Sequence, residues 1–313
     1  MANGSESFRG ALGETALPVG IAVAARQERS ESPLGQAIHR LRKSTTAVIG
    51  FFIVVALVLV ALLADVLAPD SPIASDQTQT FARPSLDHPL GTDQLGRDML
   101  SRVIHGTRVS LAVGVSSVVL ALFLGVPLGL IAGYYGGRID GVIMRLMDLI
   151  LAFPIYLLAI ILMIIFTPTA GLIGTMKVVG AIAIVRIPIY ARLVRGSVLS
   201  IKEKEYIEAC RALGARDPSI VARHVLPNCL APIIVTTTLG IATSIIVEAT
   251  LSFLGLGTQP PTPSWGWDLK ANVAFIHANA WLSLFPGLAI FVTVLGFNLF
   301  GDGLRDALDP RLK

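Results

Sequence analysis

The chain has 313 residues, of which 53% are hydrophobic and 15% are charged, and its formal net charge is +4. Soluble domains carry a charge on roughly a quarter of their residues, so this composition excludes an ordinary soluble protein and predicts an integral membrane protein. The positive charge forms no basic stripe interleaved with aromatic residues, so no nucleic-acid partner is predicted.

Six apolar segments are each about long enough to cross the bilayer, since roughly 20 helical residues span about 30 Å of hydrocarbon. They comprise residues 46–67, 109–132, 143–166, 176–193, 232–254 and 282–300. The predicted fold class is therefore all-α, a polytopic membrane protein whose domain 46–313 holds six transmembrane helices. Lys and Arg are concentrated in the amino-terminal tail, after the second and fourth segments, and at the end of the chain. Cytoplasmic loops usually carry such an excess, so both termini are predicted to be cytoplasmic.

Apart from the first span, three segments precede the second span. Residues 1–33 are rich in Gly, Ala, Ser and Glu and are predicted to be a disordered cytoplasmic tail. Residues 34–45, with apolar residues on one face and basic residues on the other, predict an amphipathic cytoplasmic helix along the membrane surface. Residues 68–108 contain four prolines and are predicted to be an extracytoplasmic loop. This loop is either a well-capped element packed on the spans or a gating or docking element.

The second span contains Gly125, Gly129 and Gly133, at intervals of four. Small residues with this spacing line one face of a helix and allow a neighbouring helix to approach closely. We therefore predict that this face packs against another span. Pro127 and Pro154, which lie in or near the second and third spans, predict kinks.

The connection between the fourth and fifth spans, residues 196–231, is much longer than the roughly two to eight residues that usually join neighbouring helices. Its residues 202–213 are predicted to form a short helix, with Glu205 and Glu208 in the early turns, where the helix dipole favours acidic groups. Gly214 is predicted to end that helix in the left-handed conformation.

A second helix is predicted directly after this glycine. Asp217 is expected to be its N-cap, Pro218 its first residue, and Pro227 the residue that ends or bends it. The small residues near the resulting corner are Ala209, Cys210, Ala212 and Ala215. Such a corner suits insertion into a groove on another protein, whereas the alternative is a loop that only joins two spans.

The fifth span carries a polar stripe on an otherwise apolar helix. Its members are Thr237, Ser244, Glu248 and Ser252. A charged residue in the middle of the membrane costs about 2.5–3.5 kcal/mol, so Glu248 is predicted to face protein or water. Its role is either an inter-helix hydrogen bond or a place along a transport pathway. Arg186 and Asp148 are the other ionisable residues predicted at depth, and pairing with Glu248 is possible for either.

No catalytic, metal or cofactor site is predicted in this chain. It contains no phosphate-binding loop of the form G-x-x-x-x-G-K-[ST], and no plausible catalytic triad. Cys210 and Cys229 have no His or Cys at ligand spacing, so they are predicted to pack as small residues.

Several separated motifs resemble one family. Glu208-Ala209-Cys210, with Gly214 five residues beyond Ala209, and Leu226-Pro227 resemble the EAA signature of binding-protein-dependent ABC importer permeases. Cys210 stands where that pattern has a second alanine, and His224 stands where it has isoleucine. Residues 33–313 are similar to the second permease subunit of dipeptide, oligopeptide and nickel importers, through HPLGTDQLGRDMLSRVIHGTRVSL, EATLSFLGLG, PSWGWDL and FNLFGDGLRDALDPRLK.

The resemblance implies a type I importer permease in the plasma (inner) membrane, with a cytoplasmic coupling helix in residues 196–231. The ATPase-coupling residues that it implies are Glu205, Glu208, Ala209, Ala212, Gly214, Ala215, Asp217, Pro218, Leu226 and Pro227. The implied partners are a second homologous permease, two cytoplasmic ATPase domains that bind ATP and Mg²⁺, an extracytoplasmic substrate-binding protein, and membrane lipid.

The predicted function is that of a non-catalytic subunit of an ATP-driven importer of dipeptides or oligopeptides. The same machinery carrying nickel or another small solute is the alternative cargo. An ion-coupled secondary transporter is a further alternative, but it predicts inverted repeats with paired broken helices, and the sequence shows none.

Overall fold

A computed structural model describes residues 33–308, so the predicted tail 1–33 lies outside the described residues except for Pro33. Within this range the chain forms helices and loops, and it contains no β-strand. The long helices are α2 (Thr45–Leu62), α4 (Met99–Tyr135), α7 (Gly171–Lys202), α10 (Leu226–Phe253) and α12 (Trp281–Leu308). The shorter ones are α1 (Pro33–Lys43), α3 (Ala64–Leu67), α5 (Gly137–Leu151), α6 (Ile155–Phe166), α8 (Glu205–Ala212), α9 (Asp217–Ile220) and α11 (Trp265–Asn272).

Five of these helices are long and apolar enough to cross a membrane, and a sixth span exists only if the bent pair α5 and α6 is counted as one. The predicted span 143–166 is thus divided between α5 and α6, and the kink predicted at Pro154 is confirmed. The two halves meet at an angle of 89°, and Pro154 occupies the N-cap position of α6. Proline in a helix interior removes a hydrogen bond and clashes with the preceding turn, which favours a break at this position. Pro127, by contrast, lies inside the continuous helix α4.

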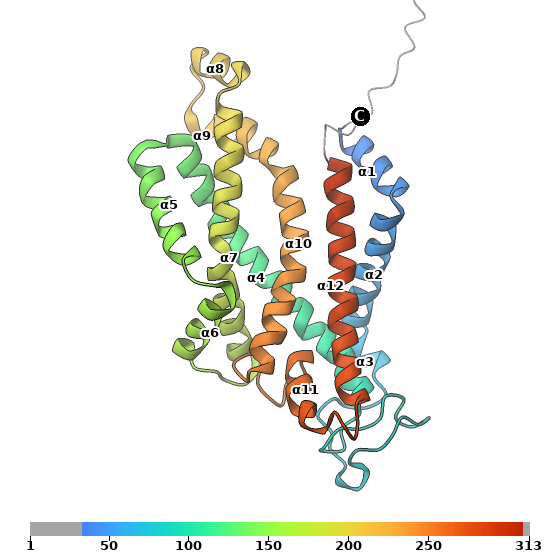
Figure 1. Cartoon of the computed structure of the whole chain (residues 1–313). Helices are drawn as coiled ribbons and strands as arrows, with labels where there is room; N and C mark the ends of the chain where they lie inside the picture. Colours follow the sequence, from blue (N-terminus) through green and yellow to red (C-terminus); the bar gives the residue numbers. More distant parts are fainter. Residues whose placement is uncertain (1–32, 309–313) are drawn as a thin grey trace, which may run out of the picture.

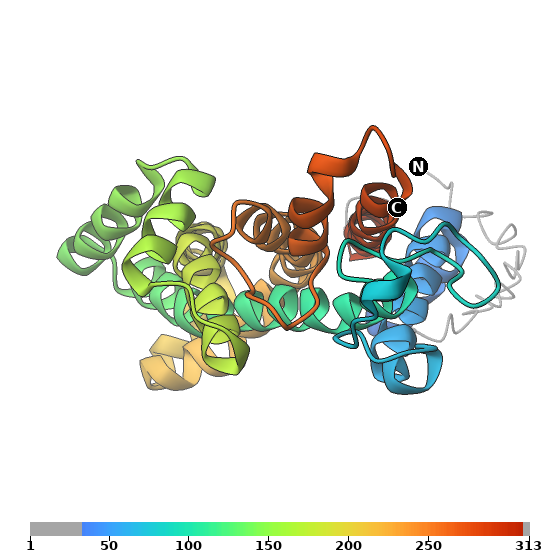
Figure 2. The ribbon, with the colours of Figure 1, turned by 90° about the horizontal axis from the view of Figure 1, so that it is seen from below.

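Helix α4 is the central element of the fold. It runs obliquely through the molecule, as Figures 1 and 2 show, and contacts α2, α5, α7 and α10. Its closest approach is to α7, along the predicted glycine face. A Cβ atom on Gly125 would lie 2.8 Å from the carbonyl oxygen of Ile187, and one on Gly129 would lie 2.5 Å from that of Ala191. The prediction that this face packs against another span is confirmed.

The other three long helices, α2, α10 and α12, also contact α4. Helix α12 contacts both α2 and α10, and it approaches α2 closely because both helices have glycines at their contact. A Cβ on Gly50 would lie 2.4 Å from the backbone nitrogen of Phe300, and one on Gly303 would lie 2.2 Å from the Cβ of Ala47. Figure 1 shows α10 between α7 and α12.

The short elements divide between the two ends of the molecule. Figure 1 shows α1, α8 and the carboxyl end of α12 at one end, and α11 with the loop before α4 at the other. That loop is shorter than predicted, because α4 begins at Met99 and not after residue 108. The connection between the fourth and fifth spans is shorter too, since α7 continues to Lys202 and α10 begins at Leu226.

Candidate functional site

The connection between α7 and α10 is an ordered corner that we define as residues 205–218. Helix α8 ends in a Schellman arrangement, in which the N–H of Gly214 donates to the carbonyl of Arg211 at 2.9 Å and that of Ala215 donates to Cys210 at 3.0 Å. Gly214 has a φ of +82°, a conformation that costs glycine little. The predicted left-handed end of this helix at Gly214 is confirmed.

One face of α8 holds the corner in place, and the other is open. Ile207 is fully buried and belongs to an apolar cluster with Val194, Val198 and Ile220. Leu213, at the tip of the corner, is 88% exposed. A single exposed leucine is common on protein surfaces, but this one projects from a segment whose backbone is fixed by hydrogen bonds. Leu213 was not among the predicted coupling residues, because the sequence alone does not distinguish an exposed leucine from a buried one.

The predicted coupling residues fall into two groups. Those that share the exposed surface of the corner are Glu205, Glu208, Ala209, Ala212, Gly214, Ala215, Asp217 and Pro218. Leu226 and Pro227 begin the membrane helix α10 instead, where Leu226 is half-buried and Pro227 is exposed.

The prediction that Asp217 caps the second helix is wrong. Arg216 occupies the N-cap position of α9, and no side chain caps that helix. The carboxylate of Asp217 instead accepts a hydrogen bond of 2.6 Å from the hydroxyl of Tyr134, at the end of α4. The guanidinium of Arg211 lies 5.3 Å from the centre of the same tyrosine ring. Tyr134 therefore ties the corner to α4, and its role was missed because 83 residues separate it from Asp217.

Pro227 was predicted to end or bend the second helix before the fifth span, and it does not end it. Helix α9 continues through a π-helical turn (Val221–Val225) directly into α10. The N–H of Leu226 bonds to the carbonyl of Val221, five residues earlier. Pro227 then sits in the first turn of α10, where the missing N–H of proline is tolerated. The corner is thus attached to the fifth span by continuous helix.

The polar stripe of α10 faces the protein interior. Ser244, Glu248 and Ser252 are fully buried, whereas Thr237 is half-buried and its hydroxyl donates to the carbonyl of Ile233. The carboxylate of Glu248 accepts hydrogen bonds from Ser252 of its own helix at 2.7 Å and from Ser110 of α4 at 3.2 Å. Of the two predicted roles for Glu248, this geometry favours the inter-helix hydrogen bond.

Neither Arg186 nor Asp148 pairs with Glu248. The guanidinium of Arg186 donates to the hydroxyl of Thr243, and Asp148 forms an ion pair with Arg192.

We expect Glu248→Ala to destabilise the protein by about 2–4 kcal/mol, because it leaves two buried serine hydroxyls without an acceptor. Glu248→Gln keeps one acceptor oxygen and should cost less. Thermal unfolding of the purified protein in detergent measures both changes. A glutamine variant with unchanged thermal stability and lost transport would contradict the packing role and support a pathway role.

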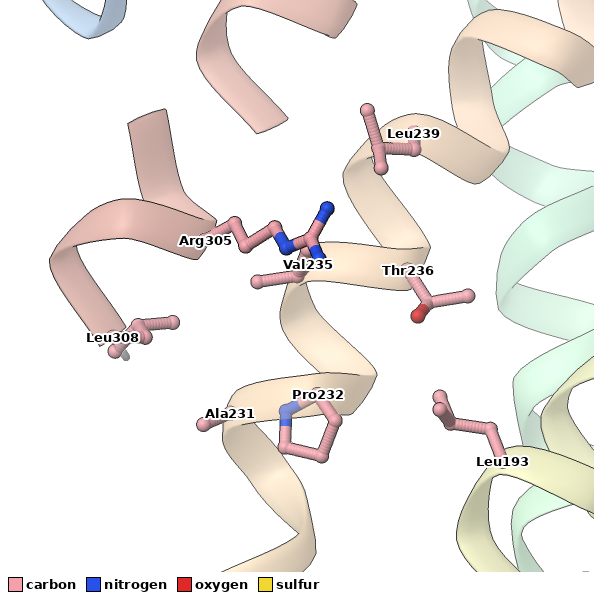
Figure 3. A pocket seen from close by; sticks show the side chains of 8 residues that line it. All are labelled: Leu193, Ala231, Pro232, Val235, Thr236, Leu239, Arg305 and Leu308. Carbon is pink, nitrogen blue, oxygen red and sulfur yellow. The ribbon is translucent and has the colours of Figure 1, made fainter. Parts of the chain in front are cut away.

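An apolar recess of about 460 Å³ lies between α10 and α12. Figure 3 shows the guanidinium of Arg305 extending from α12 toward α10, above Val235 and Thr236. The other lining residues are Leu193, Ala231, Pro232, Leu239 and Leu308. None of the four members of the polar stripe lines this recess, so the structure does not join the two features into one site.

Most of the helices of this chain match the model of one known protein family. The family model described as "Binding-protein-dependent transport system inner membrane component" matches residues 125–313. The chain belongs to this family. The permease also matches, over residues 32–84, a model described as the N-terminal TM domain of oligopeptide transport permease C.

Named relatives extend over nearly the whole permease. It is 45% identical over 287 residues to the dipeptide transport system permease protein DppC of Alkalihalophilus pseudofirmus, covering 92% of this chain and 93% of the relative. It is 45% identical over 289 residues to the glutathione transport system permease protein GsiD of Pectobacterium atrosepticum, covering 92% and 94%. The inward-facing MetNI methionine ABC transporter shares its fold, with a TM-score of 0.55 at 20% identity over 67% of this chain and 98% of that chain.

Proposed function

We propose that this permease is one of two membrane subunits that together form the pathway of an ATP-driven peptide importer. The support for a peptide cargo is that relatives 45% identical are named for dipeptide and glutathione transport. The chain has no phosphate-binding loop, so ATP and Mg²⁺ would be bound by separate ATPase subunits. Nickel or another small solute remains the alternative cargo.

The observation that carries this proposal is the exposed, hydrogen-bonded corner at residues 205–218. Its Schellman end and buried Ile207 make it a rigid projection, and its exposed residues include the small side chains Ala209 and Ala212. A rigid projection with a small-residue surface and one apolar tip fits a groove on an ATPase domain. Continuous helix from α9 to α10 would carry a displacement of the corner into the membrane.

The proposed orientation places the corner in the cytoplasm. Helix α1 and the carboxyl end of α12 lie at the same end of the molecule as α8 (Figure 1), which agrees with both termini being cytoplasmic. The loop before α4 and helix α11 would then face the extracytoplasmic side, where a substrate-binding protein would deliver its ligand.

The pathway itself would form against a second, homologous permease. Of the predicted pathway candidates, Thr237 is the one that is not fully buried in this chain. Ser244, Glu248 and Ser252 would contribute to helix packing and would reach the pathway only if the helices rearrange. Secondary transport is less well supported, because inverted repeats predict two broken spans and the described residues contain one bent pair.

Mass spectrometry of ligand retained by the cognate binding protein tests the cargo. We expect short peptides, and we expect proteoliposomes containing the complete transporter to take up those peptides only when ATP is supplied. Binding protein that has been unfolded, stripped of ligand and refolded provides the control. Retained nickel or sugar, together with uptake of that solute and not of peptide, would overturn the peptide assignment while leaving the ATP-driven mechanism intact.

A further inference from the structure

Three potential metal ligands converge in the loop before α4. Asp70 follows α3, His88 lies in the middle of the loop, and Asp98 stands at the start of α4. The Nδ1 atom of His88 lies 3.0 Å from Oδ1 of Asp98 and 3.8 Å from Oδ2 of Asp70. One ligand atom from each of the three residues lies within 4.8 Å of the other two.

Other contacts hold the carboxylate of Asp98 and the backbone of Asp70 in place. Oδ2 of Asp98 accepts a hydrogen bond of 2.7 Å from the backbone N–H of Ser101, as the N-cap of α4, and this leaves Oδ1 directed at the imidazole. The backbone N–H of Asp70 donates to the hydroxyl of the same serine at 3.1 Å. The carboxylate of Asp70 is not used by that bond, so it is available as a ligand.

The surroundings of the three side chains are strongly negative. They border a cavity of about 440 Å³ whose lining includes two further carboxylates, Asp76 and Asp87, and no Lys or Arg. Hydrogen bonds from the hydroxyl and backbone N–H of Thr78 lower the pKa of Asp76, so this carboxylate is charged at neutral pH. Four carboxylates around one imidazole, without a basic side chain, favour binding of a cation.

The two nitrogens of His88 face different oxygen atoms. Nε2 lies 2.8 Å from Oε1 of Gln79, while Nδ1 faces the two carboxylates. A neutral imidazole has one N–H donor; if Nε2–H donates to Gln79, the lone pair of Nδ1 points at carboxylate oxygens and is stabilised by a cation between them. Histidine that ligates a metal commonly donates its other N–H to an oxygen in this way.

We propose that Asp70, His88 and Asp98 bind a divalent transition-metal ion, for which zinc is the best chemical match. Nitrogen and carboxylate ligands suit zinc, and tetrahedral coordination at about 2.0–2.2 Å places ligand atoms roughly 3.3–3.6 Å apart, close to the separations of 3.0 and 3.8 Å measured from Nδ1. The ion would fasten two parts of the loop, at Asp70 and His88, to the start of α4 at Asp98. The site was not predicted from sequence, because its ligands lie far apart in a loop without regular spacing.

Zinc content of the purified full-length permease, within its complete transporter, tests this proposal. After treatment with a chelator and dialysis against Zn²⁺, we expect one zinc ion per permease chain by elemental mass spectrometry, and a rise in its unfolding temperature. Asp70→Asn and His88→Gln should each weaken zinc binding at least about tenfold. Asp70→Asn is the sharper variant, since the side chain of Asp70 is 49% exposed and its loss should not disturb folding.

His277→Gln is the matched control, because His277 is exposed and lies outside the cluster. This variant should bind zinc as the unaltered permease does. The proposal is overturned if the unaltered protein retains no zinc, which would indicate that Nδ1–H of His88 donates to Asp98 without a metal. It is also overturned if Asp70→Asn and His88→Gln retain zinc with unchanged affinity.

Discussion

Replacing Gly214 by proline is expected to uncouple transport from ATP hydrolysis while leaving the permease inserted in the membrane. Gly214 has a φ of +82°, whereas proline is restricted to about −65°. Proline also removes the N–H that donates to the carbonyl of Arg211. Helix α8 must then end differently and Leu213 must point elsewhere. We expect uptake per ATP hydrolysed to fall by roughly tenfold, the change that about 1.4 kcal/mol produces in an equilibrium.

The matched control is Gly214→Asn, because asparagine tolerates the left-handed conformation and no atom lies within 4 Å of the position of a Cβ at Gly214. This variant should keep most of the coupling, and Gly214→Ala should fall between the two. Reconstituted transporter with purified ATPase subunits provides the measurement of uptake and hydrolysis together. Wild-type uptake per ATP in Gly214→Pro would exclude the corner as the coupling element.

The corner illustrates what local sequence signals can establish. Its first helix, the left-handed glycine and the polarity of its surface follow from short-range rules, because each depends on residues within one or two turns. The predictions for this corner that are wrong concern side chains whose partners lie far away in the sequence. Asp217 looks like a cap in its own segment, but the hydroxyl of Tyr134 competes for its carboxylate, and nothing near Asp217 indicates that tyrosine.

In the membrane spans, too, features set by nearby residues were predicted and features set by distant contacts were not. Apolar length located every long helix, and the spacing of Gly125 and Gly129 correctly indicated a close helix contact. Helix ends were misplaced, because α4 and α7 extend beyond their apolar parts through polar residues that pack on neighbouring elements. Pro154 indicated a kink, but the 89° angle between α5 and α6 depends on what each half packs against, which sequence periodicity does not contain.

Helix α11 begins within the PSWGWDL motif, but neither this helix nor its contact with α4 is predicted from the sequence. Trp265 is fully buried, and its indole N–H donates to the carbonyl of Val103 at 2.9 Å. Gly106 makes room for that ring, since a Cβ there would lie 2.7 Å from it. These contacts join residues more than a hundred positions apart, so only the folded chain reveals them.

The buried ion pair beside this tryptophan is expected to give the largest loss of stability. Arg102 of α4 donates from Nε and Nη2 to Oδ1 of Asp268 at 2.8 and 2.5 Å, and both side chains are 1% exposed. Arg102 also donates to the carbonyl of Pro72 at 2.9 Å. Arg102→Ala leaves the carboxylate of Asp268 buried without its counter-ion, which costs about 3–5 kcal/mol. We expect the unfolding temperature in detergent to fall by roughly 10 °C.

Arg108→Ala is the matched control on the same helix. Arg108 pairs with Asp65 at 3.0 Å, but these side chains are 42% and 73% exposed, and exposed pairs contribute only about 0–1 kcal/mol. Replacing both buried partners, as Arg102→Met with Asp268→Leu, removes the unpaired charge and should recover part of the stability that Arg102→Ala loses. If Arg102→Ala costs no more than Arg108→Ala, the contact between α4 and α11 is held by Trp265 and its apolar neighbours, and the ion pair only fixes their orientation.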